Sequence, residues 1–269
     1  MAQILIPLPD QDFDTTEVAV PWKILTRAGH EVVFATEGGG RAPACDPLLL
    51  SGVIFGQLGA AAEAKAFYAE MIATPAFLAP RAWATLQPAD YGALLLPGGH
   101  APGMRQYLGS ELLRSKILAF WRLGRPVAAI CHGVLPLART IDPETHRSVL
   151  YGLKTTCLPK PMERTAYYLT AWKLGRYYRT YPAYVEEEVR AALRSPEDFD
   201  RGPPVLTARG TDSDDRPAFV VEDGRYLSAR WPGDAYAFAK ALLKRLSAAC
   251  ATTASASGTG SAAASARPG

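Results

Sequence analysis

The sequence has few cysteines, and their positions argue against several classes of protein. Only four occur among 269 residues, and they lie far apart, at Cys45, Cys131, Cys157 and Cys250. None belongs to a CxxC pair or to the ligand spacing of a structural zinc site, so neither a disulfide framework nor a zinc module is expected. We therefore expect a reduced protein of the cytoplasm.

Long apolar runs and strong charge are also missing. No stretch approaches the roughly 20 apolar residues that a membrane helix needs. The start, MAQILIPLPD, has no basic residues ahead of its short apolar run, unlike a signal peptide. The net charge is only +3 and Lys and Arg form no dense run, so we expect neither nucleic acid nor a membrane as a partner. With 48% hydrophobic and 20% charged residues, the composition is that of a globular protein.

What the sequence does contain is an alternation of short apolar runs and helical patterns. Gln3–Leu8 is apolar, Thr16–Ala28 has a mainly helical pattern that Gly29 closes, and His30–Ala35 is a second apolar run. This β-α-β start favours a parallel sheet with right-handed crossovers. We expect further strands at Tyr91–Leu96, Pro126–Ile130, Ala218–Glu222 and Arg225–Ala229, the last two forming a hairpin, and further helices at Ala60–Ala73, Glu111–Leu123 and Ala235–Leu246.

Two segments differ in composition from the rest. Residues 154–204 are rich in aromatic and charged side chains, which favours an inserted helical subdomain over additional sheet. Residues 247–269 consist mostly of Ala, Ser, Gly and Thr and have little to bury, so we expect a disordered tail. The predicted organisation is one α/β domain over residues 1–246, which contains the helical insertion, followed by the tail.

The chemistry is concentrated around Cys131. An apolar strand runs into Ala129-Ile130-Cys131-His132-Gly133, and a helical pattern begins directly after it. Such a tight strand-to-helix turn is typical of a nucleophile elbow, which exposes its side chain at the carboxyl edge of the sheet. The following helix N-terminus would lower the thiol pKa below its ordinary ~8.5. The alternative is that Cys131 is a small buried core residue, as many free cysteines are.

Neighbouring residues could complete such a site. His132 could act as a general base or acid beside the thiol, or could make only a structural hydrogen bond. Gly98 and Gly99 follow a predicted strand and would let the backbone approach a ligand, with His100 next to them. The backbone N–H groups of Gly99 and His132 could then stabilise an oxyanion. On its own, Pro97-Gly98-Gly99 could equally be an ordinary turn.

Glu17 is a further candidate. It lies near the start of the first predicted helix, at the carboxyl edge of the sheet where Cys131 is also expected. A protonated carboxyl group there could hydrogen-bond to the thiolate of Cys131 and transfer protons. The alternative is a glutamate that the positive end of the helix dipole stabilises.

The sequence resembles the DJ-1/PfpI superfamily, which is related to class I glutamine amidotransferase domains. The stretches that carry the resemblance are ILIPLPDQDFDTTEVAVPWKILTRAGHEVVFAT, ADYGALLLPGGHAPGMRQYL, RPVAAICHGVLPLART and DGRYLSARWPGDAYAFAKALL, in the family's order. The resemblance implies that Cys131 is the nucleophile, that Glu17 is the glutamate beside it and that His132 is the histidine of the catalytic branches. It also implies backbone oxyanion donors at Gly99 and His132.

The segment after Cys131 resembles the Hsp31-like branch of glyoxalases and chaperones. YGLKTTCLPKPMERTAYYLTAW is similar to that branch's strand, acidic residue and aromatic helical insertion. Glu163 falls where the branch carries the carboxylate that orients the histidine, although LPKPMER departs from the usual acidic pattern, and Glu163 could instead be a solvated loop residue. The two-histidine-one-carboxylate metal site of some members is not recognisable, so no metal is expected.

The resemblance implies a flavodoxin-like, doubly wound α/β fold with a mostly parallel sheet and an inserted helical cap over the cysteine. The leading function is glutathione-independent glyoxalase or deglycase-like chemistry on small 2-oxoaldehydes, without a cofactor, in a protein that could be a homodimer. A cysteine hydrolase or hydratase acting on another small electrophile is an alternative, because the fold does not fix the function. A redox sensor or holdase chaperone is the alternative from a different class.

Overall fold

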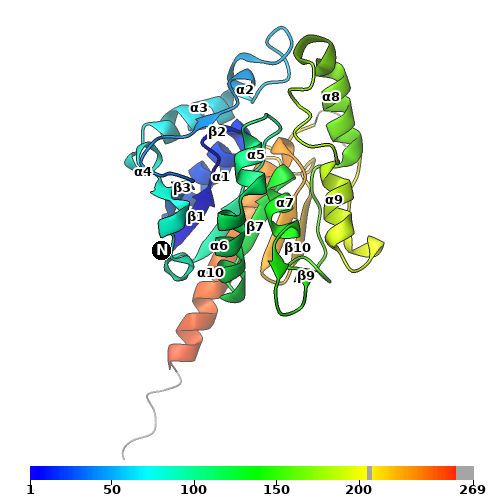
Figure 1. Cartoon of the computed structure of the whole chain (residues 1–269). Helices are drawn as coiled ribbons and strands as arrows, with labels where there is room; N and C mark the ends of the chain where they lie inside the picture. Colours follow the sequence, from blue (N-terminus) through cyan, green and yellow to red (C-terminus); the bar gives the residue numbers. More distant parts are fainter. Residues whose placement is uncertain (205–207, 259–269) are drawn as a thin grey trace, which may run out of the picture.

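A seven-stranded sheet forms the centre of the computed structural model, which describes residues 1–204 and 208–258 (Figure 1). Its strand order is β10-β11-β7-β6-β1-β3-β5, and all neighbouring strands are parallel except the β10–β11 hairpin. The strands are β1 (Gln3–Pro7), β3 (Glu31–Thr36), β5 (Arg81–Ala82), β6 (Ala93–Leu96), β7 (Val127–Ile130), β10 (Val220–Asp223) and β11 (Tyr226–Ala229). The predicted mostly parallel, doubly wound α/β fold is confirmed.

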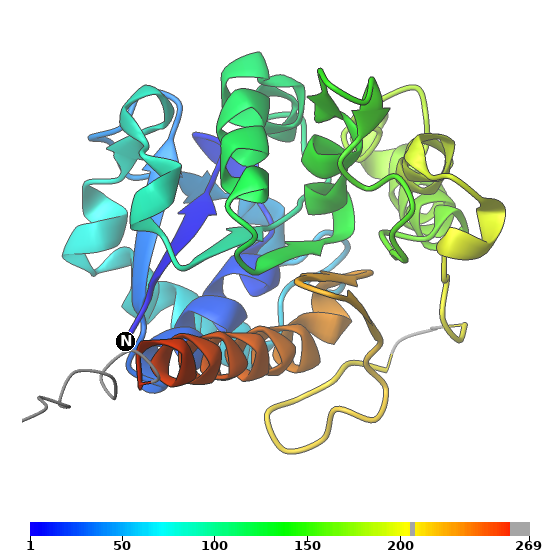
Figure 2. The ribbon, with the colours of Figure 1, turned by 90° about the horizontal axis from the view of Figure 1, so that it is seen from below.

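Helices cover both faces of the sheet, so its central strands are buried on both sides. On one face lie α1 (Thr15–Arg27) and α10 (Ala235–Gly258), and on the other lie α6 (Glu111–Arg122) and α7 (Leu135–Ala138) (Figure 2). Every residue of β6 and β7 is buried. A strand enclosed in this way reads as a continuous apolar run, which is why these two strands could be predicted from the sequence.

Several short elements lie between β3 and β6, and one more lies between β1 and α1. Two-residue and three-residue strands such as β4 pair outside the main sheet, and their length is too small for a pattern to predict them. The elements between β3 and β6 that lie outside the main sheet are β4 (Ala44–Cys45), α2 (Pro47–Ser51), α3 (Ala62–Ile72), α4 (Pro75–Leu78), η1 (Trp83–Thr85) and η2 (Pro88–Asp90). β2 (Gln11–Phe13) lies between β1 and α1 and pairs with β4, and α5 (Met104–Gly109) follows β6.

The segment between residues 154 and 204 contains α8 (Lys160–Leu174), α9 (Val185–Ala192) and η4 (Pro196–Asp198), after the small hairpin of β8 (Ile141–Asp142) and β9 (Arg147–Ser148). Hydrogen bonds join this segment to the loop around α2. The Tyr177 and Tyr178 hydroxyls donate to the Asp46 carboxylate over 3.1 and 2.8 Å, and the Lys173 ammonium donates to the Val53 carbonyl over 3.0 Å. Two segments far apart in the sequence therefore face each other above the sheet (Figure 1).

The last helix is longer than the sequence pattern predicts. A helix over Ala235–Leu246 was expected, with disorder from residue 247, but α10 continues to Gly258. Alanine has the highest intrinsic helix propensity, so an alanine-rich segment can extend a helix without burying an apolar face. The structure describes residues 247–258 as the continuation of α10, and residues 259–269 lie outside the described residues, so disorder of the tail remains a prediction. Among the helices that the structure describes, none is long and apolar enough to cross a membrane.

Gly133 allows the chain after β7 to pack against the end of β6. A Cβ atom there would lie 2.7 Å from the Pro97 carbonyl oxygen, which is closer than side chains tolerate. We predict that Gly133→Ala lowers the free energy of unfolding by about 1–3 kcal/mol, the usual cost of overpacking, and lowers the melting temperature by several degrees. Gly38→Ala is the matched control, because a Cβ atom at Gly38 meets nothing within 4 Å. Equal melting temperatures for the two variants would contradict this account.

Candidate active site

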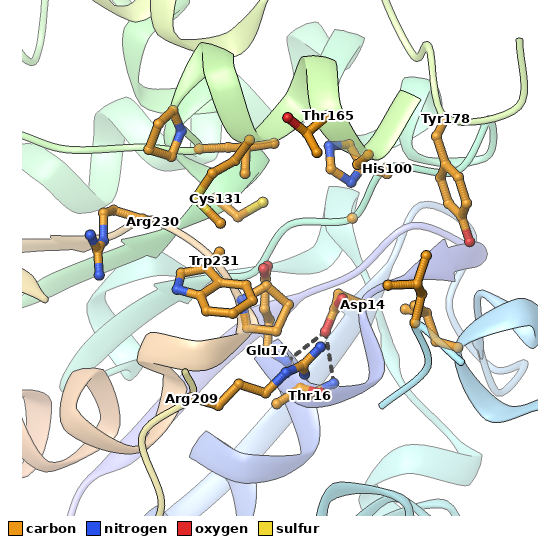
Figure 3. A pocket seen from close by; sticks show the side chains of 18 of the residues that line it. Asp14, Thr16, Glu17, His100, Cys131, Thr165, Tyr178, Arg209, Arg230 and Trp231 are labelled. Carbon is orange, nitrogen blue, oxygen red and sulfur yellow. Dashed lines mark hydrogen bonds between the residues drawn. The ribbon is translucent and has the colours of Figure 1, made fainter. Parts of the chain in front are cut away.

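A cavity of about 600 Å³ opens at the carboxyl edge of the sheet, beside Cys131 (Figure 3). Its walls come from the start of α1, the loop around α2, the turn after β6, the helix α8 and the segment after β11. Open α/β folds bind their ligands at this edge, where loops from several parallel strands converge.

Cys131 occupies a strained turn between β7 and a single 3-10 turn, η3 (Cys131–Val134). Its φ is +59°, in the left-handed region that side chains rarely adopt, and its side chain is buried. A nucleophile elbow has this geometry, and such strain persists only where the surrounding packing enforces it. The packing here is tight, since a Cβ atom on Gly98 would approach the Cys131 Cβ to 3.0 Å. The structure thus places Cys131 in an elbow, as its sequence context predicts.

Glu17 lies directly beside the thiol. Its carboxyl group is fully buried, and one oxygen, Oε2, accepts a hydrogen bond from the Gly98 N–H over 2.8 Å, while the other, Oε1, has no hydrogen-bond partner among the described residues. The neighbouring Cys131 thiol is one of the groups that shift the pKa of Glu17. Burial, and then the negative charge of Asp14, raise the pKa of Glu17 well above its ordinary value. The helix N-terminus is capped by Asp14, whose carboxylate accepts from the N–H groups of Thr16 and Glu17. The Glu17 carboxyl group therefore points at the site and does not cap its own helix.

Gly98 has a different role from the one predicted for it. Its N–H donates to Glu17, so it orients the carboxyl group and does not face a substrate. Gly99 and His100 do line the cavity. The backbone N–H of His132 is directed at the Cys131 sulfur, where it lowers the pKa of the thiol. A role for Gly99 and His132 as oxyanion donors remains a prediction.

The expectation that the elbow lowers the pKa of Cys131 is not supported. Burial, and then the negative charges of Glu17 and Asp14, raise the pKa of this thiol well above its ordinary value. The helix expected after the cysteine is only a 3-10 turn followed by the four residues of α7, so its dipole is weak. Because burial disfavours both anions and each repels the other, Cys131 and Glu17 together hold at most one negative charge near neutral pH.

His132 is positioned to take the thiol proton. Its Nδ1 lies 3.5 Å from the Cys131 sulfur, and the ring is buried. Burial, and then the positive charges of His100 and Arg139, lower the pKa of His132 well below its ordinary value. The imidazole is therefore neutral near pH 7 and can accept a proton.

His100 packs between two aromatic side chains at the cavity wall. Its ring stands edge-to-face against His132, with ring centres 4.5 Å apart, and against Tyr178, 5.9 Å away. Burial lowers the pKa of His100 to about 4, and its Nε2 has no hydrogen-bond partner among the described residues. A neutral ring with an unpaired polar atom is suited to a hydrogen bond with a bound ligand.

Glu163 is neither a solvated loop residue nor hydrogen-bonded to His132 in the part of the chain that the structure describes. It lies buried in the first turn of α8, where it accepts from the Val185 N–H over 2.9 Å and from the Arg179 guanidinium over 3.3 Å. Burial is the main cause that raises its pKa to about 7. The role of Glu163 in orienting His132 therefore remains a prediction.

His100, His132 and Glu163 form a cluster that sequence spacing could not reveal. One potential ligand atom from each lies within 4.8 Å of the others. Imidazole and carboxylate groups are ligands for zinc and similar ions, so these three residues could hold a metal, although none was expected from the sequence. The Glu163 carboxylate already accepts hydrogen bonds from Arg179 and from the Val185 N–H. A metal ion bound to this carboxylate would have to replace at least one of these hydrogen bonds.

Asp14 and Arg209 are among the charged residues of the site that the sequence analysis did not single out. Burial is the main cause that raises the pKa of Asp14 to about 6, and the nearby Arg209 opposes this shift (Figure 3). Arg209 also lies over the Trp231 ring, 5.2 Å from its centre. Asp14 could have been found as a helix cap, since it directly precedes the first helical pattern. Arg209 lies in an irregular segment, where no sequence pattern indicates that it belongs to the site.

The contact between Glu17 and Cys131 predicts how the thiol titrates. Replacement of Glu17 by Gln removes the negative charge that raises the pKa of Cys131, so the thiol pKa should fall by about one pH unit or more. The ultraviolet absorbance of the thiolate measures this pKa in wild type and Glu17→Gln, with Cys131→Ser variants of each as blanks. An unchanged or higher thiol pKa in Glu17→Gln would contradict the coupling.

Comparisons with known proteins agree with this geometry. The family model described as ThiJ/PfpI family-like matches residues 8–203. Two proteins named deglycases are similar over most of the chain. One, from Pyrococcus abyssi, is 26% identical over 91% of this chain and 99% of its own. The other, PfpI from Pyrococcus furiosus, is 25% identical over 89% and 96%.

Solved structures show the same fold. Glyoxalase III from Candida albicans superposes with a TM-score of 0.63 at 20% identity, covering 90% of this chain and 96% of its own. The Francisella tularensis rapid encystment protein gives a TM-score of 0.67 at 17% identity, covering 91% and 99%. At these identities the structures support the fold alone, while the family model covers well over half of the sequence. The chain therefore belongs to the ThiJ/PfpI-like family, within the DJ-1/PfpI superfamily.

Proposed function

We propose that this protein is a cysteine-dependent enzyme that converts 2-oxoaldehydes to 2-hydroxy acids without a cofactor, as a glutathione-independent glyoxalase or deglycase-like enzyme. The observation that carries the proposal is that Cys131 and Glu17 line one cavity, while the His132 imidazole lies 3.5 Å behind the Cys131 sulfur, all three side chains being buried. The reaction needs a nucleophile and two groups that exchange protons, and these three side chains supply them. The deglycase and glyoxalase names of similar proteins support this choice of chemistry.

The first step forms a hemithioacetal. The neutral His132 imidazole accepts the thiol proton while the Cys131 sulfur attacks the aldehyde carbon, so that a C–S bond forms and the C=O double bond becomes a single bond. The protonated Glu17 carboxyl group gives its proton to the developing alkoxide. Glu17 is then ionised beside the new C–H bond, and His132 is cationic.

The second step moves hydrogen between the two substrate carbons. The Glu17 carboxylate removes the proton from the former aldehyde carbon, and the His132 imidazolium protonates the oxygen of the neighbouring ketone, which gives an enediol. Glu17 then delivers its proton to the second carbon and regains one from the first hydroxyl group. The product is a thioester of the 2-hydroxy acid, in which the first carbon is oxidised and the second reduced.

Hydrolysis completes the cycle. His132 takes a proton from water as its oxygen attacks the thioester carbon, and then returns that proton to the departing Cys131 sulfur. The net reaction adds one water molecule and needs no external oxidant or reductant. The same groups could cleave another small electrophile, so a hydrolase remains the runner-up. A redox-sensing role is less favoured, because a buried thiol with a raised pKa oxidises slowly.

Turnover of methylglyoxal to lactate tests the proposal. Cys131→Ala should abolish lactate formation, and Glu17→Gln should lower the single-turnover rate by about 10²–10⁴-fold, the usual range for a proton-transferring group. Cys157→Ala is the matched control, since Cys157 is another buried cysteine that does not line the cavity. Lactate formation that survives Cys131→Ala, or an unaffected rate in Glu17→Gln, would overturn the mechanism.

The raised pKa of Glu17 also predicts a pH-dependent effect on stability. The folded state binds the Glu17 proton more tightly than the unfolded state, so its contribution to stability is full below the unfolded pKa and is lost as the pH rises through the folded pKa. Glutamine carries no such dependence. The difference in melting temperature, Glu17→Gln minus wild type, should therefore become steadily more positive as the pH is raised from about 4.5. A constant difference across this range would show that Glu17 titrates normally.

A further inference from the structure

The cavity is far larger than a three-carbon substrate requires. It encloses about 600 Å³, whereas the five heavy atoms of methylglyoxal would fill roughly 150 Å³ even at the ~30 Å³ that each water molecule occupies in the liquid. Cavities of several hundred Å³ are typical of sites that enclose ligands with many more heavy atoms. Methylglyoxal would therefore leave most of the cavity unfilled.

The remaining volume is bounded mainly by apolar side chains on two facing walls. Leu49, Val53 and Leu58 come from the loop around α2, and Met162, Ala166 and Leu169 come from α8. Their burial by a ligand would be favourable in proportion to the apolar area removed from water.

Hydrogen bonds between the two segments fix the position of one wall relative to the other. The Lys173 ammonium, on α8, donates to the Val53 carbonyl, and Tyr177 and Tyr178 both donate to Asp46, which is itself buried. The space between the walls is therefore preformed, and a ligand that enters it loses little affinity to rearrangement of the protein.

The residues that line the cavity differ in exposure between its two ends. Cys131 is only 3% exposed, whereas Leu58 and Leu169, which line the same cavity, are 50% and 51% exposed. The reactive group thus lies at the deep end and an apolar pair lies at the mouth. Of the three arginines in the lining, Arg230 pairs with Asp234 and Arg201 with Glu186, while Arg209 lies over the Trp231 ring near Asp14. The two facing walls between Cys131 and the mouth are apolar, so they favour an uncharged substituent.

From these observations we infer that the substrates are 2-oxoaldehydes that carry a bulky apolar substituent, either an alkyl chain of about six carbons or an aromatic ring. The inference rests on the proposed function. The dicarbonyl group lies at Cys131, and the substituent lies between the loop around α2 and α8, with its far end at Leu58 and Leu169.

A series of alkylglyoxals tests this inference. The ratio kcat/KM should rise from methylglyoxal through propylglyoxal to hexylglyoxal by about fourfold per added methylene, the factor to which about 0.8 kcal/mol per buried CH₂ corresponds. Phenylglyoxal should also exceed methylglyoxal. A flat or falling series would overturn the inference.

Two variants locate the effect. Ala166→Phe places a large side chain inside the cavity and should reduce the ratio of hexylglyoxal to methylglyoxal kcat/KM by at least tenfold. Ala171→Phe makes the same change on the same helix at a residue that does not line the cavity, and should leave that ratio unchanged. A melting curve for each variant shows that it is folded. Equal ratios in the two variants would contradict the placement of the substituent.

A binding measurement separates this inference from the proposed reaction. Cys131→Ser protein is titrated with 2-butanone and 2-octanone, which lack the aldehyde and cannot be turned over. Tighter binding of 2-octanone, reduced by Ala166→Phe, supports the apolar site even if no 2-oxoaldehyde is a substrate, and the proposed function alone then fails. If methylglyoxal is turned over but neither kcat/KM nor ketone binding depends on chain length, the inference is overturned and the proposed function stands.

Discussion

The site depends on the buried Glu17 carboxyl group, which the Gly98 N–H holds by a hydrogen bond and whose pKa is coupled to that of the neighbouring Cys131 thiol. Its members follow β1, β6 and β7, three adjacent strands of the sheet. Each is fixed by a separate local constraint: the Asp14 cap that starts α1, the tight approach of Gly98 to Cys131, and the left-handed backbone of the elbow. The parallel sheet brings these constraints to one edge, and the site forms only where all of them are satisfied.

Burial sets the chemistry of this contact. Removal from water disfavours an anion on Glu17 or on Cys131 and a cation on His132, so the resting site is close to neutral. A thiol in this state needs a base during attack, which His132 can provide, and a carboxyl group with a raised pKa can give its proton to the oxygen that becomes charged. The same desolvation that destabilises charged groups therefore prepares them for proton transfer.

The sequence predicted the parts of the site that depend on local pattern. The strand before Cys131, the elbow and the turn at Gly98 and Gly99 follow from apolar runs and glycine positions, because a parallel strand enclosed on both faces has a distinctive sequence. The direction of the Cys131 pKa could not be predicted, since it depends on burial and on neighbours from other strands. The cluster of His100, His132 and Glu163 was missed for the same reason, because α8 brings Glu163 to the histidines only in three dimensions. The sequence pattern also placed the end of the last helix at Leu246, whereas α10 continues to Gly258.

The central claim is that Cys131 forms a covalent intermediate with the carbonyl substrate. Rapid acid quenching during a single turnover, followed by intact-protein and peptide mass spectrometry, tests it directly, because a thioester survives acid. The account predicts a transient increase equal to the full mass of the 2-oxoaldehyde, located on the peptide that contains Cys131 and absent from Cys131→Ser. Product formation with no added mass at Cys131, or with the mass at Cys45 or Cys157, would contradict it.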